Sequence, residues 1–203
     1  MDGPALIRRY FPDLTSQQEE QLQLLADGLR FWNERINLVS RRDIVHLWEH
    51  HLLHSLAPAA LQPFPEGSRI ADIGTGGGLP GLPLAILFPS CHFTLVDSIA
   101  KKIRVVDELI RLTGLENAAT LRARAESMQG SFNIITGRGV TRFRSFYRLV
   151  HHLLAGHAEI LYLAGGQQDH EITIPGKKTE RIPLTTLFDL PYFESKEILR
   201  LRT

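Results

Sequence analysis

A run of glycines preceded by an aspartate is the segment of this sequence best suited to bind a ligand. Residues 70–81 read Ile-Ala-Asp-Ile-Gly-Thr-Gly-Gly-Gly-Leu-Pro-Gly and join an expected strand to an expected helix. Glycines let the backbone turn sharply and approach a ligand closely, and the amino end of the helix favours anionic groups. The segment therefore predicts a cofactor-binding loop. The contacts expected from it are Asp72, Gly74, Thr75, Gly76, Gly78 and Leu79.

Two more acidic residues follow the next two expected strands. Asp97 and Ser98 end the second strand, while Ala125 and Glu126 follow the third. Because the carboxyl ends of parallel strands meet at one edge of a sheet, these residues should share a site with the glycine loop. We expect Asp97 beside the ribose hydroxyls of an adenosine, Glu126 at its adenine edge, and Asp72 near the amino group of a methionine moiety.

Two cofactor classes are compatible with the glycine spacing. Gly76, Gly78 and Gly81 match the G-x-G-x-x-G pattern of dinucleotide-binding proteins. Asp72, together with Gly74, Gly76 and Gly78, instead matches the first motif of S-adenosylmethionine methyltransferases. The acid favours the second interpretation, because a negative charge would be unfavourable next to a pyrophosphate. A NAD-dependent oxidoreductase remains the alternative.

Basic residues are expected near the same strand ends. Lys101 and Lys102 begin the helix after the second strand, Arg142 and Arg144 follow the fourth, and Arg41 and Arg42 lie between two N-terminal helices. The net charge is only +1, with 23 basic and 22 acidic residues, so bulk charge cannot hold a nucleic acid. Recognition of unpaired RNA bases commonly uses arginine and aromatic side chains. If RNA is the partner, these six residues are the ones expected to contact it in a structured ribonucleoprotein, and no DNA is expected.

The elements that position these residues change from helical to alternating near residue 67. The capping-box pair Thr15 and Gln18 begins one helix, and a second is expected from Asp43 to about Leu61. Beyond them, strands are expected at 69–73, 92–96, 119–122, 132–136 and 159–163, with helices at 82–88, 99–113 and 143–154. Strand-like pieces follow at 171–174, 179–182 and 196–201. Alternation of this kind predicts a mainly parallel sheet.

The fold class expected is therefore α/β, a Rossmann-like sheet with helices on both faces. We expect a helical N-terminal subdomain at residues 1–66 and the Rossmann-like domain at residues 67–203. The only cysteine is Cys91, expected to be buried at the sheet end opposite the site. No apolar run has the length of a signal peptide or a membrane span, so a cytoplasmic protein without membrane contact is expected. His50 and His54 have metal-ligand spacing, but His51 replaces the glutamate of the zinc motif, and no metal is expected.

The ordered set of motifs resembles the RsmG (GidB) family of small-subunit ribosomal RNA methyltransferases. The resemblance covers about residues 10 to 166. Its matching pieces are the loop at 72–86, Trp32-Asn33, Asn37–Ser40, His51–Ser55, Leu95–Ser98 with Lys101-Lys102, Arg124–Glu126, and Arg138. It implies S-adenosylmethionine as cofactor, and as target N7 of one guanine in the decoding-region loop of 16S ribosomal RNA, either in the free RNA or in the small ribosomal subunit. It also implies cofactor contacts at Gly74, Leu79, Ala125, Glu126 and Arg138.

Arg138 is the expected catalytic residue, orienting the cofactor or the target base. Guanine N7 carries a free lone pair at neutral pH, so its methylation needs positioning more than a general base. The chain departs from the family pattern at Leu163-Ala164-Gly165 in place of Leu-Lys-Gly, and at Gly137 and Gly139 in place of Ser and Ala; His50 and His54 replace Arg and Asp. A cofactor-binding, RNA-associated protein without activity is therefore a second alternative.

Overall fold

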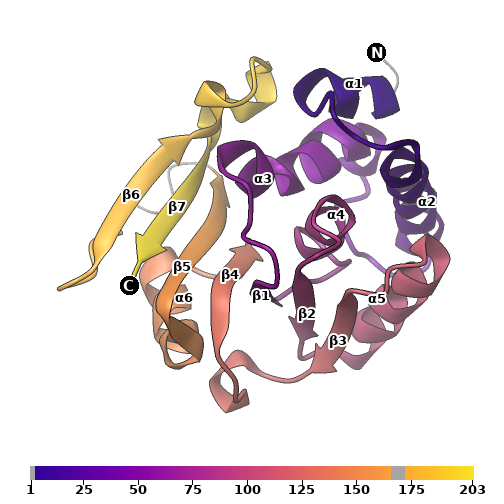
Figure 1. The fold of residues 1–203 in the computed structure, drawn as a ribbon. Coiled ribbons are helices and arrows are strands. Elements are labelled where there is room, and N and C mark those ends of the chain that lie inside the picture. Colours follow the sequence, from indigo (N-terminus) through magenta and orange to yellow (C-terminus); the bar gives the residue numbers. More distant parts are fainter. Residues whose placement is uncertain (1–2, 166–171) are drawn as a thin grey trace.

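A seven-stranded sheet forms the centre of the molecule in a computed structural model, which describes residues 3–165 and 172–203 (Figure 1). The strand order is β3-β2-β1-β4-β5-β7-β6. The strands are β1 (Arg69–Ile73), β2 (His92–Asp97), β3 (Ala118–Arg122), β4 (Phe132–Arg138), β5 (Leu154–Gly165), β6 (Lys178–Pro183) and β7 (Lys196–Arg202). β1 to β5 are parallel to one another, whereas β7 is antiparallel to β5 and to β6.

The expected strands are confirmed except at 171–174. Residues 172–174 adopt no regular structure, and residue 171 lies outside the described residues. β5 is longer than expected because it begins at Leu154, where a helix was expected to continue. The preceding helix, α6, ends at Val150 and is followed by the single 3-10 turn His151–Leu153.

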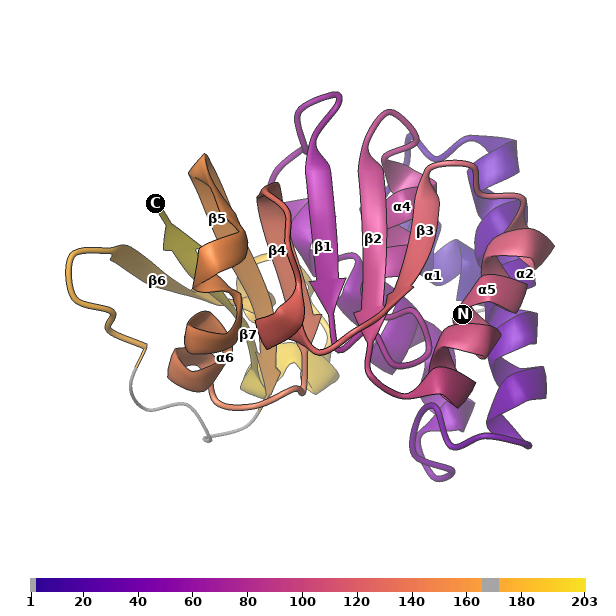
Figure 2. The same cartoon turned by 90° about the horizontal axis from the view of Figure 1, so that it is seen from below.

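Helices cover both faces of the sheet, as the sequence predicts. They are α1 (Gly3–Tyr10), α2 (Ser16–Asn33), α3 (Ala57–Leu61), α4 (Gly81–Leu87), α5 (Ala100–Thr113) and α6 (Phe143–Val150). Alternate residues of β1 point to opposite faces: Ile70 packs in a core with α2, α4 and α5, and Ala71 packs in a core with α6. In Figure 2, α6 lies against β4 and β5, while α2 and α5 lie side by side beyond β3. No helix in residues 3–165 or 172–203 is long and apolar enough to span a membrane.

α2 begins at the capping box expected from the sequence and packs closely on α5. The Thr15 hydroxyl accepts a hydrogen bond from the Gln18 backbone at 3.2 Å, and the Gln18 side chain accepts one from the Thr15 backbone at 3.0 Å. Gly28 faces α5, and a Cβ there would lie 2.5 Å from a methyl of Leu109. The missing side chain therefore allows the N-terminal helices to share one core with the sheet.

The expectation of a single helix from Asp43 to Leu61 is wrong. The chain instead forms a 3-10 turn (Ile44–His46), a π-helix (Leu47–Leu53) and then α3. Pro58 has no N–H to continue the hydrogen bonding of the preceding turn, so a new helix begins around it. The wide π turns also let two consecutive histidines approach the same carboxylate, that of Asp43. Such π turns are often found at functional sites.

Candidate functional site

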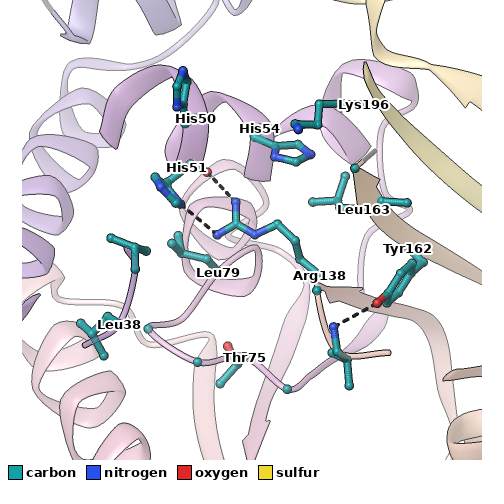
Figure 3. A pocket seen from close by; sticks show the side chains of 18 of the residues that line it. Leu38, His50, His51, His54, Thr75, Leu79, Arg138, Tyr162, Leu163 and Lys196 are labelled. Carbon is teal, nitrogen blue, oxygen red and sulfur yellow. Dashed lines mark hydrogen bonds between the residues drawn. The ribbon is translucent and has the colours of Figure 1, made fainter. Parts of the chain in front are cut away.

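A cleft of about 740 Å³ opens at the carboxyl ends of the parallel strands (Figure 3). The glycine loop after β1 forms one wall, the loop after β4 and the end of β5 form another, and the π-helix closes a third side. Its lining residues are Leu38, Val39, His50, His51, His54, Gly74, Thr75, Gly76, Gly77, Leu79, Lys102, Arg138, Gly139, Val140, Thr141, Arg142, Tyr162, Leu163, Ala164, Gly165, Tyr192 and Lys196. In open α/β sheets this edge is where ligands bind.

Asp72 holds the glycine loop from beneath. Its carboxylate accepts hydrogen bonds from the Thr75 hydroxyl at 2.6 Å, the Gly81 backbone at 3.0 Å and the Thr136 hydroxyl at 3.1 Å. The side chain is completely buried, and burial raises its pKa above the usual value, although these three bonds oppose the rise. Both oxygens accept hydrogen bonds within the protein, and contact of Asp72 with a methionine amino group remains a prediction.

Asp97 fixes the other side of the same loop. One of its oxygens accepts from the Gly76 backbone at 3.1 Å, and the other accepts from the Ile99 backbone at 2.9 Å. Gly76 has a φ of +60°, which favours glycine. A Cβ at Gly76 would meet only the Gly74 carbonyl, at 3.9 Å, and would therefore project into the cleft. The loop offers bare backbone to a ligand there.

The residues expected to bind the cofactor divide into two groups. Those that line the cleft are Gly74, Thr75, Gly76, Leu79 and Arg138. Those that do not line it are Asp72, Gly78, Asp97, Ser98, Ala125 and Glu126. Glu126 and Ser98 are exposed, whereas Ala125 is buried in the 3-10 turn Ala125–Ser127. Contact with a cofactor remains a prediction for each of these positions.

Arg138 extends from the end of β4 across the cleft to the π-helix (Figure 3). Its guanidinium donates to the His51 carbonyl and contacts the His51 Nδ1 atom, both at 3.4 Å. The His51 Nε2 atom lies 2.6 Å from the Asp43 carboxylate. Burial and the charge of Arg138 lower the pKa of His51 to about 4. The ring is therefore neutral at pH 7, with Nε2–H donating to Asp43 and Nδ1 accepting from Arg138.

The loop that carries Arg138 is fixed by Tyr162 on β5. The Tyr162 hydroxyl accepts from the backbones of Val140 and Thr141, at 3.0 and 3.1 Å, and donates to the Thr141 carbonyl at 2.6 Å. Before the loop, Gly137 leaves room for Phe146, whose ring would lie 2.7 Å from a Cβ at that position. Gly137 and Gly139, which depart from the family pattern, therefore flank Arg138 at the start of a fixed loop.

The residues expected to contact RNA also divide. Lys102 and Arg142 line the cleft, whereas Arg41, Arg42, Lys101 and Arg144 do not. The four lining cations are Lys102, Arg138, Arg142 and Lys196, and no aspartate or glutamate is among the lining residues. Among the residues that the structure describes, every lysine, arginine, aspartate or glutamate that lines the cleft is thus a cation, which suits a polyanion.

Sequence reasoning missed most of the cleft's far end. His54 is 4% exposed, and neither ring nitrogen has a hydrogen-bond partner among the described residues. Its burial, together with the charges of Arg138 and Lys196, lowers its pKa well below the usual value. His50, for which no metal is expected, stacks on Tyr192 with ring centroids 3.7 Å apart. The close spacing of His50, His51 and His54 was the available signal; within residues 3–165 and 172–203 no three potential ligands could hold a metal ion.

Solved structures of similar shape show the class of fold. A SAM dependent methyltransferase from Aquifex aeolicus aligns with a TM-score of 0.55 at 11% identity, covering 72% of this chain and 88% of that one. A precorrin-6y C5,15-methyltransferase from Geobacter metallireducens aligns with a TM-score of 0.53 at 11% identity, covering 82% and 90%. These likenesses, each at 11% identity, show a Rossmann-like fold with the glycine-loop cleft at the strand ends.

The sequence comparisons identify the family. The family model described as GidB, rRNA small subunit methyltransferase G, matches residues 18–186. A ribosomal RNA small subunit methyltransferase G from Cytophaga hutchinsonii is 40% identical over 200 residues, covering 96% of this chain and 97% of the relative. Its counterpart from Christiangramia forsetii is 41% identical over 203 residues, covering 97% and 95%. The chain belongs to the GidB family of methyltransferases.

Family membership confirms the resemblance, the fold class and the enzyme class expected from the sequence. Neither alternative, a NAD-dependent oxidoreductase or a binding protein without activity, is favoured by these comparisons.

Proposed function

We propose that this protein transfers a methyl group from S-adenosylmethionine to N7 of one guanine in the decoding-region loop of 16S ribosomal RNA, in the cytoplasm. The observation that carries the proposal is the cationic cleft next to the glycine loop, in a chain whose relatives are named ribosomal RNA small subunit methyltransferases. The substrate is 16S RNA, free or within the small subunit.

The glycine loop fits an adenosine cofactor with a charged amino-acid end. Gly76 presents its backbone to the cleft with no side chain over it, Gly74 and Thr75 line the cleft next to it, and Leu79 is 4% exposed. We place the cofactor along this loop, with Arg138 near its carboxylate or the target base. When bound, S-adenosylmethionine supplies an electrophilic methyl carbon on a sulfonium.

The composition of the cleft suits methylation of a ring nitrogen. Guanine N7 has no proton to lose, so no general base is needed, and no carboxylate is among the described lining residues. His51 is neutral at pH 7 because its pKa is about 4. A sulfonium methyl donor would bring one positive charge and the N7-methylated purine would carry one, so the cleft residues would face the same net charge before and after transfer. Catalysis here then rests on orientation of the two reactants.

Transfer of tritiated methyl groups tests the proposal. Small subunits from a strain that lacks the modification are the substrate, and subunits from the parent strain are the matched control. We expect incorporation only into the unmodified subunits, with N7-methylguanosine mapped to one decoding-region nucleotide. In calorimetry, S-adenosylmethionine should bind and NAD should not. Methylation of another atom, or binding of NAD alone, contradicts the proposal.

A further inference from the structure

The end of the cleft farthest from the glycine loop contains a cation that the function above leaves unused. Lys196 is the first residue of β7 and lines the cleft beside His54 and Leu163 (Figure 3). β7 pairs antiparallel with β5, and this pairing places Lys196 opposite Gly165, the last residue of β5. A side chain from the C-terminal hairpin therefore lines the same cleft as the cofactor loop, at the opposite end.

Gly165 leaves the space through which Lys196 reaches the cleft. A Cβ at Gly165 would lie 3.0 Å from the Lys196 Cδ atom and 3.1 Å from its ammonium nitrogen. Tyr192 supports the ammonium from the other side, with the nitrogen 4.8 Å from the ring centroid, a cation–π contact. Tyr192 stacks on His50, and His50 is held by Asp43 at 2.6 Å. The position of the ammonium is thus defined by packed neighbours.

No carboxylate neutralises this ammonium among the described residues. The ammonium contacts the Ser195 hydroxyl at 3.4 Å, and the neighbouring Glu197 is paired with Arg181 at 2.5 Å. Lys196, Arg138 and His54 line the same cleft (Figure 3), and the charge of each of the two cations lowers the pKa of the histidine. Two cations therefore flank one buried, neutral ring that has no hydrogen-bond partner of its own.

We propose that Lys196 and Tyr192 form a phosphate subsite for the RNA strand that carries the target base. The inference rests on the proposed function and adds where the acceptor RNA enters: along the β5–β7 end of the cleft, opposite the cofactor loop. An ammonium is a compact point charge with three donors, which suits a phosphate rather than a base edge. Arg138, between the two ends, is left to orient the base or the cofactor.

The test compares Lys196→Met with Lys196→Arg and with the control Lys178→Met. Methionine keeps an apolar side chain against Tyr192 but removes the charge, and Lys178 is an exposed lysine at the start of β6 outside the cleft. For Lys196→Met we expect KM for the unmodified small subunit to rise about tenfold, and the salt dependence of RNA binding to lose about one phosphate contact. The Kd for S-adenosylmethionine and the kcat should stay within about twofold of wild type, because a phosphate contact positions the RNA and takes no part in the reaction.

The subsite is supported if Lys196→Met raises KM while Lys196→Arg and Lys178→Met both keep the wild-type KM. Two results overturn it while leaving the proposed function intact: an unchanged KM and salt slope in Lys196→Met, or a weaker Kd for S-adenosylmethionine as the main effect. The second would place Lys196 on the cofactor carboxylate. If wild-type protein does not methylate the subunit, the proposed function itself fails. The subsite can still be tested by RNA binding in that case, and it is overturned if wild type and Lys196→Met have the same salt slope.

Discussion

Arg138 at the end of β4 and His51 in the π-helix are 87 residues apart in the chain, yet the guanidinium contacts both the carbonyl and the Nδ1 atom of His51 at 3.4 Å. The contact joins the parallel sheet to the N-terminal helical region across the cleft. Asp43 holds the far side of the same imidazole at 2.6 Å. The direction of the Arg138 side chain therefore depends on the N-terminal region as well as on the loop after β4.

Replacement of Arg138 should reduce turnover more than binding. Lysine retains the charge but loses the planar fork that reaches two acceptors, and alanine loses both. We expect kcat to fall more than tenfold in Arg138→Lys and about 100-fold in Arg138→Ala, as is typical for loss of an orienting donor in an active site. The matched control is Arg142→Ala, which changes an exposed arginine of the same cleft and should affect mainly KM. Equal losses in Arg138→Ala and Arg142→Ala would contradict a special role for Arg138.

The stability of the protein should fall as pH is lowered through the range where His51 would gain a proton. Its pKa is about 4 in the folded chain, compared with 6.5 for an ordinary histidine. The unfolded chain thus binds a proton that the folded chain refuses, so the contribution is complete above about pH 6.5 and is lost as pH falls towards 4. The difference corresponds to roughly 3 kcal/mol. Urea unfolding between pH 4.5 and 7.5 measures it.

His51→Gln separates this residue from other titrating groups. Glutamine can donate to Asp43 and accept from Arg138 but does not titrate. We expect the free energy of unfolding of His51→Gln to vary less with pH than that of wild type, although the buried His54, whose pKa is also lowered, leaves part of the dependence. Identical pH profiles for the two proteins would show that His51 is already free to take a proton in the folded state.

Asp72 should act through the shape of the glycine loop and not through its charge. Alanine removes the acceptor for Thr75, Gly81 and Thr136, leaving buried donors unpaired. We expect Asp72→Ala to lower the free energy of unfolding by about 2–4 kcal/mol and to weaken S-adenosylmethionine binding more than tenfold, as measured by calorimetry. Asparagine keeps an oxygen for Gly81 and Thr75, and the Thr136 hydroxyl can rotate to accept. If Asp72→Asn lost cofactor affinity as severely as Asp72→Ala, a direct charge contact would be indicated instead.

Local patterns in the sequence predict local structure well in this chain. The Thr15–Gln18 capping box begins α2 as expected, and strands β1 and β2 begin at the predicted residues. The start of each of these elements is set by residues close to it in the sequence. Pro58 begins a new helix within the segment 43–61 because it lacks a backbone N–H, and the apolar periodicity alone did not indicate this break.

The far end of the candidate site could not be predicted in the same way. Ala164 stands where the family pattern has a lysine, and nothing near it in the sequence indicates a replacement. Lys196 reaches the same loop only through the antiparallel register of β5 and β7, which pairs it with Gly165.

The side-chain direction of Asp72 is likewise a property of packing. An acid at the mouth of a glycine loop can face either the ligand or the loop itself, and here its partners are Thr75 and Gly81.

Gly137 should be intolerant of any side chain, although the family pattern has one at that position. In this chain a Cβ would lie 2.7 Å from the Phe146 ring and 3.1 Å from the Ile73 carbonyl, so either α6 or β4 must move. We expect Gly137→Ala to lower the free energy of unfolding by about 1–3 kcal/mol, and to reduce methyl transfer because Arg138 follows directly. Gly156→Ala in β5 is the matched control, since a Cβ there has no neighbour within 4 Å. Urea unfolding of the two variants makes the comparison, and equal stability would mean that Phe146 can move aside at no cost.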